Sequence, residues 1–477
     1  MNIITIAWIA LPFFLGFVIY LCPRFDRSLA LVTSLASAAY AVLLFTQPIP
    51  VALQLLDHFG VTLIADSLSG FFILTNALVT MAVLFYCWQS GKSAFFYAQA
   101  TILHGSVNAA FVCSDFISLY VALEVLSIAA FLLIAYSRTD RSIWVALRYL
   151  FVSNTAMLFY LVGAVLVYQT HHSFSFAGLQ DAPIEAVALL FLGLLVKGGI
   201  FVSGLWLPLT HSESETPVSA LLSGVVVKAG VYPLLRCALV LEEFDPIVRL
   251  FGVGTALLGV GYAVFEKDTK RMLAFHTVSQ LGFILAAPVV GGFYALTHGL
   301  VKSALFLIAG ALPSRNFKEL QHRPIHTPIW IALVMASFSI SGFPMLSGFG
   351  AKVLTMKSLA PWQPMAMNLA ALGTAISFAK FIFLPHKSQE SASVKPGFWA
   401  AVILLIGGLL IANVVYFEAY TLANIAKPLA IIGLGWVAYF AIFRRTTVKL
   451  PRVLEEFDHL IGVMSLMLIL LFWMVWA

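Results

Sequence analysis

Six ionisable residues lie in stretches that are otherwise almost wholly apolar, and they are the residues best suited to do chemistry. A charged side chain at the centre of a bilayer costs about 2.5–3.5 kcal/mol on insertion scales, so these residues should face a polar interior. Burial disfavours the charged form, so a buried lysine can take up and release a proton, whereas arginine stays charged. We therefore interpret the set as a proton relay rather than as structural ion pairs. Its members are Glu124, Lys197, Lys228, His298, Lys302 and Lys352.

The composition indicates that the solvent of this chain is mostly lipid. Of its 477 residues, 61% are hydrophobic and 10% are charged, whereas a soluble domain carries roughly 25% charged residues. This excludes a soluble enzyme, a disordered chain and a nucleic-acid binder. No motif for a phosphate-binding loop, a dinucleotide, zinc or an iron–sulfur cluster is present, and the 4 cysteines are widely separated, so we expect no cofactor and no metal.

Apolar stretches of about 20 residues are long enough to cross a bilayer as helices. The first stretch has no basic start and no cleavage site, so we interpret it as a span and not as a signal peptide. The prediction is an all-α polytopic membrane protein with 14–16 spans. The candidate spans are 3–21, 28–46, 68–88, 93–113, 116–136, 143–169, 185–209, 218–241, 246–265, 273–290, 293–312, 328–358, 364–385, 397–416, 423–443 and 458–477.

Lys and Arg are distributed unevenly between alternate loops. The loops after even-numbered spans hold only Arg249, Lys357 and Lys427. Cytoplasmic loops are enriched in Lys and Arg, so we predict that the odd-numbered loops are cytoplasmic and that both termini lie on the other side of a bacterial inner membrane or a thylakoid membrane. The basic residues after odd-numbered spans are Arg24, Arg27, Lys92, Arg138, Arg141, Lys267, Lys270, Arg271, Arg315, Lys318, Arg323, Lys387, Lys395, Arg444, Arg445, Lys449 and Arg452.

The other ionisable residues near or within spans are interpreted individually. Arg148, Arg236 and Lys380 lie near span ends, where long side chains can reach the headgroups. His104 lies within span four and is counted with the relay. The segment 211–215, HSESE, is predicted to be a solvated cytoplasmic loop in which His211 is a candidate for proton uptake.

Two spans are interrupted by glycine and proline beside a lysine. Span seven carries a Gly-Gly pair directly after Lys197, and span twelve is interrupted from Gly342 to Gly350, just before Lys352. Broken helices of this kind in both halves of a chain are typical of transporter sites built from inverted repeats. The predicted organisation is 1–92 for N-terminal helices 1–3, 93–241 for a first inverted repeat of helices 4–8, 246–385 for a second inverted repeat of helices 9–13, and 397–477 for C-terminal helices.

Five segments resemble motifs of the antiporter-like membrane subunits shared by respiratory complex I and the Mrp-type Na⁺/H⁺ antiporters. The resemblance covers spans five to twelve and implies a 14-helix core with broken helices 7 and 12. The segments are LEVLSIAAFLL around Glu124, VKGGIFVSGLWLPLTHSESETPVSALLSGVVVKAGVYPLLR at 196–236, EKDTKRMLAFHTVSQLGFILAA at 266–287, THGLVKSALFLIAGAL at 297–312 and ISGFPMLSGFGAK at 340–352.

The resemblance implies a role for each relay residue. In the family the span-five glutamate pairs with the span-seven lysine, and protons move along a hydrated central axis that is coupled to a neighbouring subunit or a cation path. The chain departs from the family pattern at Glu213 and Glu215. The matched positions are Glu124 in span five, Lys197 in span seven, Lys228 in span eight, His298 and Lys302 in span eleven, and Lys352 on the exit side of span twelve.

Among family members, a D-type subunit of an Mrp-like cation/proton antiporter fits best. M-type subunits typically have Glu where this chain has Lys352, and the L-type and A-type subunits carry a long lateral helix. N-type subunits also have Lys, so a proton-pumping subunit of an NADH-, ferredoxin- or hydrogenase-linked complex remains an alternative, as does a membrane subunit of proton-driven inorganic-carbon uptake. We expect a transporter subunit rather than an enzyme, with other membrane subunits, protons, Na⁺ and the lipid bilayer as partners.

Overall fold

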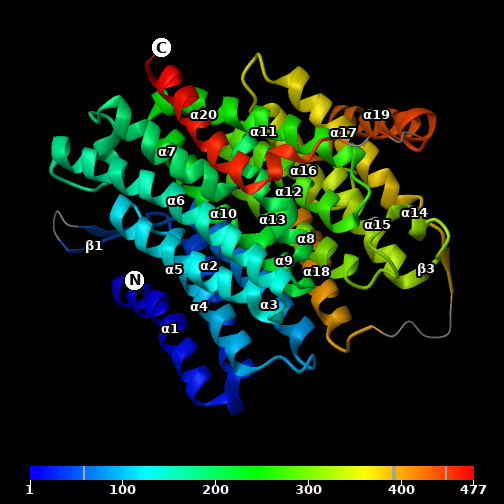
Figure 1. Cartoon of the computed structure of the whole chain (residues 1–477), viewed down its shortest axis with the longest axis horizontal. Helices are drawn as coiled ribbons and strands as arrows, with labels where there is room; N and C mark the ends of the chain where they lie inside the picture. Colours follow the sequence, from blue (N-terminus) through cyan, green and yellow to red (C-terminus); the bar gives the residue numbers. More distant parts are fainter. Residues whose placement is uncertain (57–59, 389–393, 446–447, 449, 477) are drawn as a thin grey trace.

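The computed structural model describes residues 1–56, 60–388, 394–445, 448 and 450–476 and is built almost entirely of helices (Figure 1). Within these residues, 13 helices are long and apolar enough to cross a membrane. The other three predicted spans correspond to the short α4 (Ala94–Ala110), to the more polar α12 (Thr269–Ala286), and to α15 (Thr327–Ser341) with α16 (Ser347–Lys357). The prediction of an all-α polytopic protein is confirmed. Lys449, one of the predicted loop cations, lies outside the described residues.

The N-terminal part adds a small β-hairpin that the span analysis missed. Val51 pairs with Ala65 in an antiparallel register, and Ile64 donates its N–H to the carbonyl of Val112 at 2.7 Å. Asp66 caps the following helix by accepting from the N–H of Ser69. The elements are α1 (Asn2–Leu21), α2 (Asp26–Thr46), β1 (Val51–Leu56), β2 (Gly60–Ala65) and α3 (Ser67–Cys87).

The central helices pack around α13 (Gly291–Ala309), whose residues are almost all buried between α3, α12, α15, α16 and α18. The remaining helices before it are α5 (Phe116–Ile134), α6 (Asp140–His171), α7 (Ile184–Gly198), α8 (Leu207–Glu213), α9 (Thr216–Leu221), α10 (Lys228–Val240) and α11 (Asp245–Phe265). The later elements are α14 (Phe317–Leu320), β3 (Ile325–His326), α17 (Pro364–Ile382), β4 (His386–Lys387), α18 (Phe398–Val415), α19 (Leu422–Ala438) and α20 (Phe457–Trp476).

Both predicted helix breaks are present, and each begins at a glycine with left-handed backbone. Helix α7 ends at Gly199, with φ +68°, and α15 ends at Gly342, with φ +84°. Glycine adopts this conformation without the penalty that a Cβ would impose, so it ends a helix sharply. After the first break the chain forms a 3₁₀ segment, η4 (Phe201–Trp206), before α8 continues.

Several ion pairs connect loops that are far apart in the chain, and each pair joins loops that the charge pattern assigns to the same side of the membrane. On the side of the odd-numbered loops the pairs are Lys92–Glu215, Arg141–Glu213, Arg315–Asp268, Arg452–Glu266 and Arg271–Glu455. On the other side Arg236 holds Asp66 through two bonds of 2.5 and 2.6 Å. The structure is thus consistent with the predicted alternation of loops.

The C-terminal helices separate and contact different parts of the core. Helix α19 lies against α17, whereas α20 packs along α7 and η4 (Figure 1). The segment that leads into α20 is bound at a buried ion pair, in which Arg271 donates to both carboxylate oxygens of Glu455 at 2.7 and 2.8 Å. Arg148 also donates to the carbonyl of Glu455.

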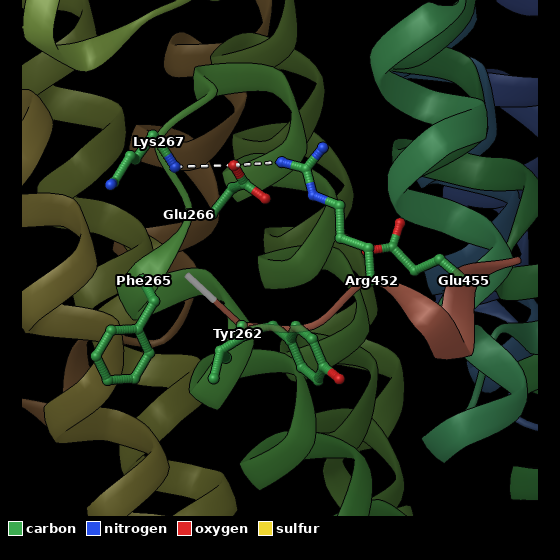
Figure 2. A pocket seen from close by; sticks show the side chains of 7 residues that line it. Tyr262, Phe265, Glu266, Lys267, Arg452 and Glu455 are labelled. Carbon is green, nitrogen blue, oxygen red and sulfur yellow. Dashed lines mark hydrogen bonds and ion pairs between the residues drawn. The ribbon is translucent and has the colours of Figure 1, made fainter. Parts of the chain in front are cut away.

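A neighbouring carboxylate, Glu266, lies between the main chain of Lys267 and the guanidinium of Arg452 (Figure 2). These residues line a pocket of about 340 Å³. Burial raises the pKa of Glu266, but Arg271 and the backbone N–H groups of Asp268 and Lys267 outweigh burial and hold the pKa below its usual 4.5. Burial of Glu455 dominates over its ion pair, so the pKa of Glu455 is raised.

Candidate functional site

The six predicted relay residues lie on five neighbouring helices of the core. Glu124 is on α5, Lys197 on α7, Lys228 on α10, His298 and Lys302 on α13, and Lys352 on α16. Five of them are buried, with at most 6% of the residue exposed, and Glu124 is half-buried. The structure therefore brings together residues that are far apart in the chain, such as Lys228 and Lys302, which interact electrostatically.

The ammonium group of Lys197 is held by serine hydroxyls and not by Glu124. It donates to Ser127 Oγ on α5 and to Ser153 Oγ on α6, the latter at 2.7 Å. Glu124 lies one helical turn from Ser127 and interacts electrostatically with Lys197, but its Oε1 atom has no hydrogen-bond partner in the described residues. No hydrogen bond or salt bridge joins Glu124 to Lys197 in the described residues, although the two groups interact electrostatically, so the pair implied by the resemblance stays a prediction.

Lys228 is held by a local widening of its own helix. Residues Leu222–Val226 form a π-helical turn, η5, in which the N–H of Val227 reaches the carbonyl five residues back, that of Leu222. The carbonyls of Ser223 and Gly224 accept from Lys228 Nζ at 3.3 and 2.6 Å. Single π turns of this kind are frequent at functional sites. Here the turn supplies neutral acceptors to a fully buried ammonium group.

Glycines let α7, α10 and α13 pack closely, which places Lys197 and Lys228 on adjacent helices. At the crossing of α7 and α10, a Cβ at Gly230 would lie 2.3 Å from the backbone nitrogen of Gly198. Gly198 directly follows Lys197, and Gly230 lies two residues after Lys228, so this contact brings the backbones beside the two lysines close together. On the other side, a Cβ at Gly299 would lie 3.6 Å from Lys228 Cε, so the Lys228 side chain runs beside α13 next to His298.

Helix α13 carries the centre of the axis. Lys302, one turn after His298, donates to the carbonyl of Leu273 on α12 and lies 5.2 Å from the ring centroid of Phe306. The ring of His298 makes no hydrogen bond in the described part of the chain and interacts electrostatically with Lys228 and Lys302. Buried polar groups of this kind are usually satisfied by water, so this region is suited to hydration.

Two cavities continue the axis from His298 through Lys352. A small cavity of about 10 Å³ is lined by both residues and by Gln280 and Tyr294, whose hydroxyl donates to Gln280 Oε1 at 2.7 Å. The volume approaches the roughly 10–15 Å³ that one water molecule requires. A second cavity, of about 190 Å³, begins at Lys352 and reaches the exposed residues Lys357 and Lys427, which the charge pattern assigns to the side opposite the basic loops.

The prediction of a solvated HSESE loop is wrong for three of its five residues, His211, Ser212 and Ser214, which are buried. His211 and Ser212 belong to α8 and are buried, because α8 packs against α12 and α6. The ring of His211 has no hydrogen-bond partner in the described residues and interacts electrostatically with Lys302, Lys270 and Lys228. Glu213 and Glu215 are at the surface and pair with basic residues of neighbouring loops.

Two further buried ionisable residues extend the site and were not predicted. His276 on α12 is fully buried, contacts Phe378 with tilted rings whose centroids are 4.7 Å apart, and interacts electrostatically with Lys302 and Lys352. Lys270, predicted in a loop, lies in the first turn of α12 and donates to the carbonyl of Ser214 at 2.8 Å. Like His298, His276 is a histidine inside an apolar stretch of the sequence. This pattern could have predicted that His276 is buried.

Four other ionisable residues have structural partners instead. Lys380 donates to three carbonyls at the end of α11, where a cation complements the helix dipole. Arg236 is paired with Asp66, and Arg148 donates to Glu455, so these three residues are bonded rather than free to reach headgroups. His104 is hydrogen-bonded to Ser37, Thr80 and Asn108 in a polar network of α2, α3 and α4, and its place in the relay stays a prediction.

The arrangement consists of proton-carrying groups in a largely closed protein interior. Within the described residues no group of three or more His, Cys, Asp or Glu side chains could hold a metal ion. Proton transfer between side chains and water requires hydrogen-bonding distances of about 2.6–3.2 Å or one bridging water. The buried lysines, the unbonded imidazoles and the cavities at Lys352 provide groups and space for such transfers.

The chain belongs to the NADH:quinone oxidoreductase/Mrp antiporter transmembrane family, which residues 113–377 match. It is 29% identical over 327 residues to the D-type subunit of the Na⁺/H⁺ antiporter of Alkalihalophilus pseudofirmus, an alignment covering 62% of this chain and 66% of the relative. It is 31% identical over 362 residues to the N-type subunit of the NADH-quinone oxidoreductase of Desulforudis audaxviator, covering 68% of this chain and 72% of the relative. The chain thus spans about two thirds of the length of these relatives.

The fold is similar to that of a solved antiporter-type subunit. A chain in the structure of the Mrp complex from Dietzia sp. DQ12-45-1b matches with a TM-score of 0.75 at 20% identity, covering 97% of this chain and all of that one. At this identity the likeness concerns the fold. It extends from the helices of the matched family segment to those at both ends of the chain.

Proposed function

We propose that this chain is a membrane subunit of a multi-subunit cation/proton antiporter of the Na⁺/H⁺ type, and that it moves protons along the axis from Glu124 to Lys352. The observation that supports the proposal is the row of ionisable residues on α5, α7, α10, α13 and α16. A cavity that reaches the molecular surface lies at the end of this row, beside Lys352. The similarity to a D-type antiporter subunit supports the same function. We place the chain in a bacterial inner or thylakoid membrane, with the basic loops in the cytoplasm.

In the proposed mechanism, protons reach the axis from the side of the basic loops and leave through the cavity beside Lys352. His211 and Lys270 lie between that side and the central Lys302 and Lys228, so they are suited to uptake. In the described residues the hydrogen bonds of Lys197 go to neutral hydroxyls, so the charge of Glu124, which interacts with it electrostatically, would alter its protonation. This electrostatic coupling would transmit a change of state to a neighbouring subunit or cation path.

We also infer that residues 93–241 and 246–385 form two inverted repeats. Each range contains one broken helix that ends at a left-handed glycine, Gly199 or Gly342. Each also places a buried lysine near that break, Lys197 or Lys352. Repeats of this kind place their sites at mid-membrane, where the broken helices meet.

A direct assay is Na⁺-dependent pH change in inverted membrane vesicles that contain the complete complex. Lys228→Gln should abolish the signal at unchanged complex abundance, because the amide cannot carry a proton. Lys318→Gln, at an exposed residue of the short helix α14, is the matched control and should be neutral. Wild-type transport by Lys228→Gln would exclude a proton path through α10.

The second candidate is a proton-pumping subunit of a redox-driven complex, which the 31% identity to an N-type subunit of NADH-quinone oxidoreductase favours. Affinity purification of the tagged chain from its native membrane, followed by mass spectrometry, distinguishes the two. Small membrane subunits alone would support the antiporter. Co-purifying iron–sulfur or flavin subunits would support the redox-driven pump and overturn the first proposal.

A further inference from the structure

The cavity of about 190 Å³ beside Lys352 is lined by positive charge without a compensating acid. Its walls come from α15, α16, α17 and α19. Three lysines line it, Lys352, Lys357 and Lys427, and none of the lining residues is Asp or Glu. In the described part of the chain no ion pair or hydrogen bond involves these three ammonium groups. Like charges around one cavity repel one another, so the arrangement favours an anion between them.

The inner end of this cavity holds polar atoms without hydrogen-bond partners in the described residues, and the ammonium group of Lys352 lies 5.3 Å from the ring centroid of Phe283. Lys352 is 6% exposed, and its Nζ makes no hydrogen bond in the described residues; the same is true of the Ser341 hydroxyl and of Asn368 Oδ1, which line the same cavity. An unpaired buried charge is costly. A bound anion would accept hydrogen bonds from both the ammonium group and the Ser341 hydroxyl.

The position of the cavity indicates which anion it meets. Lys357 is the last residue of α16 and Lys427 is in the second turn of α19, and both are exposed. Further along α19, Leu434 and Val437 are 63% and 65% exposed, as expected of a helix that faces lipid. The two lysines therefore lie where a membrane helix begins, at the level of the headgroups, with Lys352 behind them.

We propose that this cavity binds a phosphate group, held by the ammonium groups of Lys352, Lys357 and Lys427 and by the hydroxyl of Ser341. Phosphate presents several strong acceptor oxygens and is a common ligand of lysine clusters. The headgroup of an anionic phospholipid and free inorganic phosphate share this chemistry. The same charges repel Na⁺, so the cavity is an unfavourable exit for a metal cation.

The proposal concerns the binding of a phosphate group, so it is tested by measuring binding and does not require a transport assay. The tagged complex would be purified in mild detergent, delipidated, and titrated with phosphatidylglycerol in mixed micelles and, separately, with inorganic phosphate. The variant is K357Q/K427Q, which leaves Lys352 in place. The matched control is K318Q/K387Q, which removes two exposed lysines from the opposite face. S341A provides an uncharged test of the inner end and should also weaken binding.

Each lysine near a membrane surface contributes about 1 kcal/mol to phosphate attraction. The double variant should therefore bind about thirtyfold more weakly, since a tenfold change corresponds to 1.4 kcal/mol. If phosphatidylglycerol binds with this dependence and inorganic phosphate does not compete, the ligand is a headgroup. If inorganic phosphate binds to the wild type and is lost in the variant, the ligand is free phosphate. Equal binding to wild type, variant and control, or binding to none of them, would overturn the proposal.

Discussion

The glycine crossing between α7 and α10 gives a sharp test of whether the axis depends on helix spacing. In Gly230→Ala the new Cβ would lie 2.3 Å from the nitrogen and 2.7 Å from the Cα of Gly198, and 2.8 Å from the carbonyl carbon of Lys197. All three are backbone atoms, so no side-chain rotation relieves the contacts. The helices must separate by about 1 Å to reach ordinary van der Waals distance. Overpacking of this severity costs about 3 kcal/mol, and the better helix propensity of alanine returns about 1 kcal/mol.

The net loss of about 2 kcal/mol should lower the thermal stability of the purified complex. A shift of about 1 Å between groups that exchange a proton slows transfer by roughly a hundredfold, so Na⁺-dependent pH change in inverted vesicles should fall well below wild type after normalisation to complex abundance. Gly261→Ala in α11 is the control, because its Cβ meets nothing within 4 Å. If Gly230→Ala transports as well as Gly261→Ala, the close approach of the two helices is irrelevant to the path.

Three further substitutions test the relay and the attachment of the C-terminal segment. Glu124→Gln should abolish proton movement in the vesicle assay while complex abundance is kept, since the amide retains the shape and loses the charge; wild-type transport would make Glu124 structural. Glu455→Gln should destabilise the purified protein by about 1.5–3 kcal/mol in thermal unfolding, because it weakens a buried, charge-assisted contact with Arg271; an unchanged midpoint would contradict this. The lowered pKa of Glu266 means that its stabilising contribution is present above pH 4.5 and is lost as the pH falls through the folded value. Thermal midpoints between pH 7 and pH 3 should therefore fall less steeply for Glu266→Gln than for wild type, and parallel curves would refute the assignment.

The main features of the fold were readable from the sequence because lipid imposes strong constraints on composition. Spans of apolar residues, the alternation of basic loops and the glycines at both breaks all reflect the cost of exposing charge or backbone to hydrocarbon. The burial of ionisable residues was readable for the same reason, since a lysine such as Lys228 is unfavourable in an apolar run unless the protein accommodates it. The hairpin β1–β2 was not predicted, because it lies between spans where these constraints are absent.

What could not be read from the sequence were the partners of the buried charges. Serine is common in membrane helices, so nothing in the sequence distinguishes Ser127 and Ser153 as the groups that hold Lys197. The π turn that supplies acceptors to Lys228 likewise has no sequence signature. His211 was placed in a loop because its polar neighbours resemble a solvated segment, whereas packing of α8 under α12 buries it. Contacts between helices decide the cases of Lys197 and His211, and a local change of helix geometry decides that of Lys228.

The same contacts show what the two last helices, α19 and α20, cover in the core. Helix α19 supplies Asn424 and Lys427 to the cavity beside Lys352, so it forms part of the wall at the second break. Helix α20 packs along α7 and against η4, directly after the first break, and is held there through Glu455. A broken helix in a membrane is tolerated only where other protein or water satisfies it. Helices α19 and α20 therefore cover the two helix breaks, and loss of either should affect the residues near the break that it covers more than those near the other break.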